Sequence, residues 1–225
     1  MATENASMIN VIICDDHVLY RAGIKAVLSS KKDIKVIAEA DNGSHLLNLL
    51  KAIQPDVILL DIQMPVMDGI ATLPELKKLY SNIRIIMLTM MDDQNMITKL
   101  MELGANSYLT KTSDAEIIYE AIKTCYEQEF YFNSLPNKPL LNNLRQKTPS
   151  SIKLHQEDAI FSEKEIAVLR LMCEEKSTRE IAEAIELTPR SVETIRDKLM
   201  TKTGAKSTAG LIIFAVKNKL LLQET

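Results

Sequence analysis

The sequence predicts an α/β domain followed by an all-α domain. Up to Glu127, short apolar runs alternate with amphipathic stretches about ten residues long, which is typical of a doubly wound parallel sheet. Residues 161 to 222 carry no strand pattern and contain four helical stretches. Between them, Pro136, Pro139 and Pro149 interrupt any helical or strand periodicity, as expected of an interdomain linker. Within this linker, a partly helical stretch is expected around Leu140–Arg145.

Five β-branched runs are expected to form a five-stranded parallel sheet. Runs that are apolar throughout indicate strands covered on both faces. The predicted strands are Val11–Cys14, Ile34–Ala38, Val57–Leu60, Ile83–Leu88 and Ser107–Leu109. The amphipathic stretches predict helices at Leu19–Ser29, Ser44–Ile53, Leu73–Leu79, Asp93–Leu103 and Ala115–Glu127. Asp41–Gly43 opens one helix, Pro55 ends one and Gly104 terminates another.

The C-terminal part predicts four helices with a tight turn between the second and third. They are expected at Glu163–Cys173, Ser177–Ile185, Pro189–Thr203 and Ser207–Lys217. The first helix can be capped by Ser162 with Glu165, and the second by Thr178 or Ser177. The third can be capped by Thr188, which precedes Pro189, and it ends at Gly204. About three residues, Glu186 to Thr188, separate the second and third helices. That is the spacing of a helix-turn-helix.

Composition sets bounds on function. The chain has 225 residues, enough for one large or two small domains, and its net charge of −3 does not indicate nucleic-acid binding. From residue 161 onward, however, eleven Lys/Arg face ten Asp/Glu, so the acidity lies upstream. Three isolated cysteines suggest buried free thiols in a reducing compartment. With no secretory signal or apolar run of membrane-spanning length, we expect a cytoplasmic protein.

Polar residues stand at or just past the ends of the predicted strands: Asp15, Asp16, Asp61, Thr89 and Lys111. The carboxyl ends of parallel strands share one edge of a sheet, where such folds bind ligands. Three carboxylates crowded together repel one another unless a hard cation lies among them, and Mg²⁺ prefers oxygen ligands. A hydroxyl and an ammonium suit phosphoryl oxygens. The pattern indicates a site that accepts a phosphoryl group on one of its own aspartates.

Each of these residues also has a structural explanation. An aspartate after a strand often caps the next helix, and Asp61 precedes a loop that contains Pro65 and Asp68. Thr89 suits a strand, and Lys111 suits a solvated surface. Their occurrence together, in order, at the ends of four strands favours the functional interpretation.

Residues 8 to 127 resemble the receiver domain of bacterial two-component response regulators, which has a flavodoxin-like fold. The resemblance is carried by the Asp15–Asp16 pair, the segment DVILLDIQMPVMDG, the Leu88–Thr89 strand end and Lys111. It implies that Asp61 is the phosphoacceptor, and that Lys111 and Thr89 contact phosphoryl oxygens.

The resemblance also implies a Mg²⁺ cofactor. Asp16 and Asp61 would be direct ligands, Gln63 would add its backbone carbonyl, and Asp15 would act mostly through bound water. Tyr108 matches the aromatic switch position, although a partly buried strand tyrosine is the structural alternative.

Two positions depart from the usual receiver pattern. Thr112 follows Lys111 where many receivers have proline, which puts a cis peptide there in doubt. Met90 follows Thr89 where a small residue is common, so it would narrow access to the phosphoryl group.

The third predicted helix of the C-terminal part has two faces. Val192, Ile195 and Leu199 recur at helical spacing and should pack inward. The opposite side carries Arg190, Glu193, Thr194, Asp197 and Thr201. Taken alone, such a mixed polar face is usually just solvated.

The segment from Phe161 to Ser207 resembles the LuxR-type helix-turn-helix, and the domain order resembles the NarL/FixJ class. The resemblance makes Pro189–Thr203 the recognition helix, although Ile195 replaces a frequent histidine. The implied DNA-binding residues are Glu193, Thr194 and Asp197 at base edges, Lys202 and Lys206 at phosphates, and also Arg190 and Lys198. In the fourth helix, Leu211, Ile212 and Ala215 are available to pack or to pair with a second copy.

These patterns together predict a response regulator that controls transcription. The expected domains are a receiver at 8–129, a linker at 130–158 and a DNA-binding domain at 159–225. The expected partners are a sensor histidine kinase, double-stranded DNA and, after phosphorylation, a second copy. The chain would not be an enzyme beyond its own phosphorylation and dephosphorylation.

Two alternatives remain. One is a phosphorylation-independent DNA-binding or interaction protein with a vestigial receiver. The other is an aspartyl-phosphate hydrolase, which would be expected to carry a D-x-D pair where this chain has Asp15–Asp16.

Overall fold

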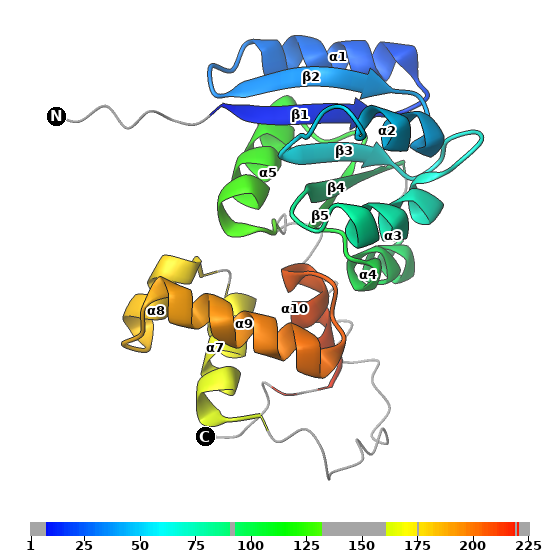
Figure 1. Ribbon diagram of the computed structural model, residues 1–225. Helices are drawn as coiled ribbons and strands as arrows, with labels where there is room; N and C mark the ends of the chain where they lie inside the picture. The colour runs from blue at the N-terminus through cyan, green and yellow to red at the C-terminus, as the bar shows by residue number, and fades with distance from the viewer. Residues whose placement is uncertain (1–7, 91–92, 132–160, 175, 219, 221–225) are drawn as a thin grey trace, which may run out of the picture. The chain divides into compact units, whose positions relative to one another are not determined.

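The computed structural model describes residues 8–90, 93–131, 161–174, 176–218 and 220. The chain divides into two compact units, Met1–Asn133 and Ser134–Thr225 (Figure 1). The first is an α/β unit and the second is helical, which confirms the predicted fold class. Most of the predicted linker, including Leu140–Arg145, lies outside the described residues.

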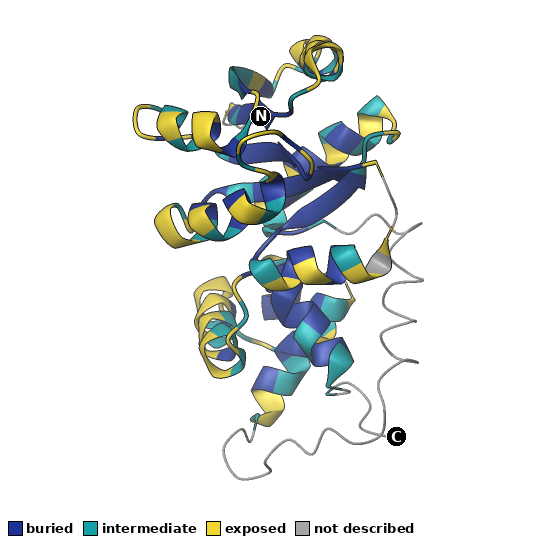
Figure 2. Cartoon of the chain, turned by 90° about the vertical axis from the view of Figure 1, so that its right-hand side faces the viewer, coloured by how far each residue is buried: buried dark blue, intermediate teal, exposed yellow. Residues whose placement is uncertain are grey.

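The N-terminal unit contains a parallel five-stranded sheet in the order β2-β1-β3-β4-β5. The strands are β1 Ile9–Cys14, β2 Ile34–Ala40, β3 Val57–Asp61, β4 Arg84–Thr89 and β5 Ser107–Thr110. All five predicted strands are present, with their ends within two residues of the prediction. Every residue of β3 is buried, in keeping with a sheet covered on both faces (Figure 2).

Helices cover the sheet in two layers. They are α1 Val18–Ser29, α2 Gly43–Leu49, α3 Gly69–Leu79, α4 Gln94–Leu103 and α5 Ala115–Gln128. The α1 helix contacts α5, and the core between them and the sheet includes Val11, Ile13, Leu28 and Ile122. On the other face α3 contacts both α2 and α4 (Figure 1). This winding leaves the carboxyl edge of the sheet accessible between loops.

Two helices differ from their predicted bounds by four residues at one end. The α2 helix ends at Leu49 rather than Ile53, because the chain tightens into i→i+3 bonds such as Ala52 N to Leu49 O at 3.0 Å. The α3 helix begins at Gly69 rather than Leu73, because the Asp68 side chain caps it by accepting Ala71 N at 2.7 Å.

The C-terminal unit consists of α7 Glu163–Cys173, α8 Thr178–Ala184, α9 Pro189–Thr203 and α10 Thr208–Lys217. Capping boxes start α7 at Ser162 and α8 at Ser177, and the Thr188 side chain caps α9. The α9 helix ends at Gly204, whose φ of 72° is left-handed. It contacts α7, α8 and α10. Nowhere in the described residues is there a helix with the length and apolar character needed to cross a membrane.

Candidate functional site

Strand register brings the predicted polar residues to one edge of the sheet. Cys14 of β1 is level with Leu60 of β3, so the residues that follow them, Asp15 and Asp61, are neighbours across the two strands. Thr89 ends β4 level with Thr110 of β5, and Lys111 comes next. The Lys111 amide donates to Thr89 O at 2.7 Å, which holds the two strand ends together. The convergence that strand order predicts is therefore present.

Four side chains gather there: Asp15, Asp16, His17 and Asp61. One ligand atom from each lies within 4.8 Å of the other three. Asp15 is fully buried and Asp61 is 2% exposed, whereas His17 lies on the solvent side. The prediction missed His17, although its position next to the acidic pair was a signal that could have found it.

Lys111 supplies positive charge to this cluster. Its Nζ lies 2.8 Å from Asp15 Oδ2 and 2.9 Å from Asp61 Oδ2, and its side chain is only 6% exposed. The ammonium also lies 5.2 Å from the centre of the Tyr20 ring, at the start of α1. No sequence pattern indicated this ring.

Burial and nearby charges shift the pKa values of both Asp61 and Lys111. Burial raises the pKa of the Asp61 carboxyl above its usual range, and the Asp15 charge adds to this, while Lys111 and the Gln63 amide oppose it. Burial works against the Lys111 ammonium, but hydrogen bonds and charge from Asp15 and Asp61 outweigh it, so the pKa of Lys111 is raised. Lys111 is therefore a cation at neutral pH and a standing counter-ion for both aspartates.

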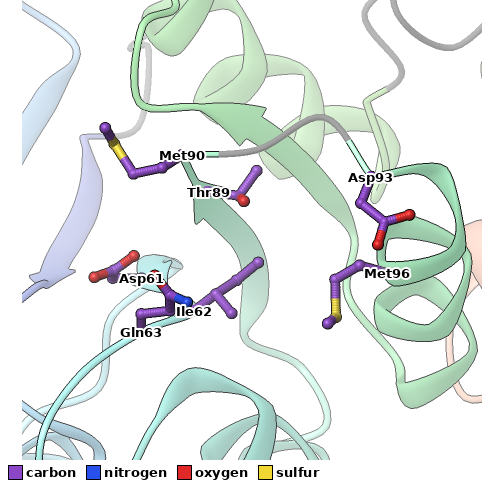
Figure 3. A pocket seen from close by; sticks show the side chains of 7 residues that line it. All are labelled: Asp61, Ile62, Gln63, Thr89, Met90, Asp93 and Met96. Atoms are coloured by element: carbon purple, nitrogen blue, oxygen red, sulfur yellow. The ribbon is translucent and has the colours of Figure 1, made fainter.

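A small cavity of about 60 Å³ opens beside Asp61 (Figure 3). Its lining residues are Asp61, Ile62, Gln63, Thr89, Met90, Asp93 and Met96. Thr89 is 8% exposed, whereas Met90 is 66% exposed. The Thr89 hydroxyl and the Asp61 carboxylate thus line the same small cavity. Met90, the residue predicted to narrow access to the phosphoryl group, lines it as well.

Gly69 allows the loop after β3 to close on this site. A Cβ at Gly69 would lie 2.1 Å from the Asp61 carbonyl oxygen, so only glycine fits without displacing the strand end. The Gly69 amide donates to Ile62 O at 2.9 Å. Asp68 and Gly69 therefore do more than start α3, because Gly69 also allows the loop to pack closely against the strand end that carries Asp61.

The cluster fits a hard divalent cation. Three carboxylates and one ammonium leave a net negative charge in a partly buried space. Carboxylate oxygens are the ligands that Mg²⁺ prefers.

Tyr108, the residue predicted at the aromatic switch position, is not part of this cluster. It lies in β5 level with Met87 of β4 and is buried, with 2% exposure.

A second candidate surface lies on α9. Val192 and Leu199 are buried and Ile195 is partly buried, whereas the outward residues are all exposed: Arg190, Glu193, Thr194, Asp197 and Lys198. The Thr194 hydroxyl donates to Arg190 O at 2.9 Å, so its proton is used within the helix and its oxygen is left to accept. The outward face therefore carries the residues expected on it.

The two lysines expected at phosphates have different surroundings. Lys202 Nζ lies 2.7 and 2.8 Å from the Glu165 carboxylate oxygens and 5.7 Å from the Phe161 ring centre. Glu165 is also the capping-box residue of α7, so Lys202 ties α9 to the start of α7. Lys206 is exposed, and no ion pair within the described residues involves it.

Comparison with known proteins follows the same division of the chain. Residues 11–123 match the family model of the response regulator receiver domain. Residues 159–215 match the model of bacterial regulatory proteins of the luxR family.

Similar proteins of like length include two curated regulators. The transcriptional regulatory protein LiaR of Bacillus subtilis is 33% identical, over 95% of this chain and 100% of its own. The response regulator protein VraR of Staphylococcus saprophyticus is 30% identical, over 95% of this chain and 99% of its own. The solved RcsB response regulator of Salmonella typhimurium covers 92% of this chain and 97% of its own, with a TM-score of 0.56. At 24% identity, that structure supports the fold alone.

Proposed function

The chain belongs to the two-component response regulators that join a receiver domain to a LuxR-type DNA-binding domain, and we propose that phosphorylation of Asp61 controls its binding to DNA. The observation that carries the proposal is the ion-paired cluster of Asp15, Asp61 and Lys111 at the carboxyl edge of the sheet. The domain limits we propose are 8–129 for the receiver and 159–225 for the DNA-binding domain, with 130–158 as linker.

The reaction is phosphoryl transfer from a phosphohistidine of a sensor kinase. A carboxylate oxygen of Asp61 attacks phosphorus, the P–N bond breaks, and the electron pair returns to the kinase imidazole. The product is an acyl phosphate on Asp61. The chain performs this step on itself and turns over no separate substrate.

Lys111 and Thr89 receive the phosphoryl oxygens. The ammonium already lies 2.9 Å from Asp61 Oδ2, so it needs only a small shift to pair with a phosphoryl oxygen. The Thr89 hydroxyl lines the cavity beside Asp61 and is within the same small space as the new group. Met90 stands at this cavity and would limit the approach of hydrolytic water.

Asp15, Asp16 and Asp61 would hold Mg²⁺, with the Gln63 carbonyl as a further ligand. A bound Mg²⁺ would offset the repulsion between the carboxylates and an incoming phosphoryl group. Asp15 is fixed for this role, because Arg21 donates to its carbonyl oxygen and the His17 amide donates to its Oδ1 at 2.8 Å. Tyr108 is the proposed switch residue that responds to the phosphorylated state.

The output is sequence-specific binding to double-stranded DNA. The exposed face of α9 would enter the major groove with Glu193, Thr194 and Asp197 at base edges, and Arg190 and Lys198 beside them. Lys206 is the better candidate for a phosphate contact, because Lys202 already pairs with Glu165. Phosphorylated chains would pair as homodimers, since helix-turn-helix proteins match the symmetry of their DNA sites.

The direct test is chemical phosphorylation with acetyl phosphate, followed by intact mass measurement. The wild type should gain one phosphoryl group only when Mg²⁺ is present, and Asp61→Asn should gain none. Asp41→Asn is the matched control, because Asp41 is an exposed carboxylate that pairs with His45 and is not among the clustered ligands. Labelling of Asp61→Asn as fast as the wild type would refute the assignment, and steady release of phosphate from phosphomonoesters would indicate a hydrolase.

A further inference from the structure

We propose that His17 is an additional ligand of the cation site. It would raise the affinity of this receiver, relative to its affinity for Mg²⁺, for divalent ions that accept an imidazole nitrogen. The ions in question are of the Co²⁺ and Zn²⁺ type. The inference rests on the proposed function, because the same carboxylates hold the cation. It goes further because it names a fourth side chain and predicts ion selectivity.

The distances around His17 are those of neighbouring ligands on one ion. Its Nδ1 lies 2.8 Å from Asp16 Oδ1 and 3.2 Å from Asp15 Oδ1. Two ligands bound at right angles, each about 2.1 Å from an ion, are about 3.0 Å apart. A cation at the Asp15–Asp16 pair would therefore find the imidazole nitrogen at the spacing of an adjacent ligand.

Among the described residues, the polar contacts of the His17 imidazole are to the carboxylates of Asp15 and Asp16 alone, which belong to the cation site itself. His17 occupies the N-cap position of α1, but its side chain makes no capping hydrogen bond. Its ring is 65% exposed, so it can turn toward a cation without loss of packing. Its backbone amide donates to Asp15 Oδ1 at 2.8 Å, which keeps the residue beside the carboxylates.

Ligand chemistry gives the expected selectivity. Carboxylate oxygens suit Mg²⁺, whereas imidazole suits the later transition ions. A site with three carboxylates and one imidazole should therefore gain more affinity for Co²⁺ than for Mg²⁺ from its histidine. A hydrogen bond from His17 to Asp16 alone, with no contact to the ion, would change both affinities together.

Calorimetry on the full chain tests this. In His17→Asn, the affinity for Co²⁺ should fall about 10- to 100-fold while that for Mg²⁺ stays within a factor of about two. His45→Asn is the matched control, because His45 Nδ1 lies 3.0 Å from a single carboxylate oxygen, of Asp41, outside the cluster. It should change neither affinity.

Two further measurements separate the possible failures. The Co²⁺ form should show a strongly shifted imidazole N–H proton resonance that His17→Asn removes and His45→Asn keeps. Asp16→Asn should weaken both ions, and if it weakens neither, the proposed cation site itself is wrong. If Asp16→Asn weakens both ions but His17→Asn lowers Mg²⁺ and Co²⁺ affinity equally, or lowers neither, the role of His17 is overturned while the cation site stands.

Discussion

Lys111 shows how one side chain sets the charge of the pocket. Its ammonium lies within 2.9 Å of carboxylate oxygens of both Asp15 and Asp61 and is almost fully buried. In this geometry it neutralises part of the cluster before any cation or phosphoryl group arrives. Its removal would leave more negative charge, which repels a phosphoryl group but attracts Mg²⁺.

We therefore expect Lys111→Ala to bind Mg²⁺ at least as tightly as the wild type but to lose the change in DNA affinity that a phosphodonor causes. Mg²⁺ titration and DNA binding with and without acetyl phosphate measure the two effects. Lys25→Ala is the control, because Lys25 forms an exposed pair with Glu39. Loss of Mg²⁺ binding, or a normal response to the phosphodonor, would contradict the proposed contact.

Lys77, in α3, is a second lysine with unusual surroundings. The residue is partly exposed, but its ammonium donates to Ile83 O at 3.0 Å and to Asn106 Oδ1 at 2.8 Å, both neutral acceptors. Burial, with a smaller contribution from the Arg84 charge, lowers the pKa of Lys77 to about 7. An unfolded chain restores an ordinary lysine pKa of about 10.4.

This difference predicts a dependence of stability on pH. Between about pH 7 and 10 the unfolded chain binds a proton that the folded chain lacks, so Lys77 makes the free energy of unfolding rise with pH. Lys77→Met should remove that rise, so its stability relative to wild type should fall as pH increases through this window. Urea unfolding at several pH values measures the effect. Lys78→Met, at an exposed neighbour, should leave the rise unchanged.

At the scale of elements, the loop between β3 and α3 holds backbone strain beside the pocket. Val66 has a φ of 68°, which a β-branched residue rarely adopts, and its side chain is 86% exposed. The Met67 amide donates to Pro65 O at 2.7 Å across it, in a tight three-residue turn. Exposure means that no packing offsets the strain.

Val66→Asn should raise the free energy of unfolding of the receiver by about 1 kcal/mol, because asparagine adopts a positive φ more readily than a β-branched residue does. Urea unfolding measures it. Val18→Asn is the control, since Val18 is also exposed, at 66%, but begins α1 with no positive φ. An equal gain in both variants, or none in Val66→Asn, would rule out strain as the cause.

The ends of α9 and α7 are also linked at this scale. Lys202 reaches the Glu165 carboxylate across 37 sequence positions, and Glu165 in turn caps α7. Burial opposes the charge of Glu165, but the bonds from Lys202 and Ser162 outweigh it and lower its pKa. A phosphate would have to compete with this pair for Lys202.

Lys206→Ala should therefore weaken binding to all DNA sequences alike and reduce the slope of log affinity against log salt by about one unit. Lys202→Ala should reduce that slope by less. Salt titrations of DNA binding by the two variants measure the slopes. Equal losses of about one unit would show that Lys202 leaves Glu165 to contact phosphate.

At the scale of the whole molecule, the proposed phosphoacceptor and the proposed recognition helix lie in separate compact units. A modification shifts an equilibrium only by stabilising one state more than another. For the proposed mechanism to work, phosphorylation of Asp61 would have to stabilise a state that the DNA-binding unit distinguishes, and dimer formation would provide one.

We expect a phosphoryl mimic such as beryllium fluoride with Mg²⁺ to strengthen dimer formation by about 1–3 kcal/mol, the usual range of coupling energies. Analytical ultracentrifugation measures this, with Asp61→Asn as the control that should not respond. A chain that stays monomeric in both states yet binds DNA more tightly with the mimic would point to release of an occluded recognition helix.

The sequence by itself determined the fold class and most of the proposed pocket. Runs such as Val57–Leu60 reveal strands by their apolar character, and the carboxyl ends of parallel strands share an edge in any such sheet. The order of the strand ends was therefore enough to place Asp15, Asp61, Thr89 and Lys111 together. The caps at Ser162 and Thr188 were predictable as well, because a cap depends on neighbours only three residues away.

Only the tertiary structure decided which side chains touch across long separations. That His17 turns toward Asp16, that Tyr20 lies by the Lys111 ammonium and that Lys202 is held by Glu165 depends on rotamers and on packing between distant elements. Sequence periodicity determines the face on which a residue lies, but it does not determine distances of 3 Å between charged atoms of different elements, such as Lys202 and Glu165. Those distances follow from the packed fold.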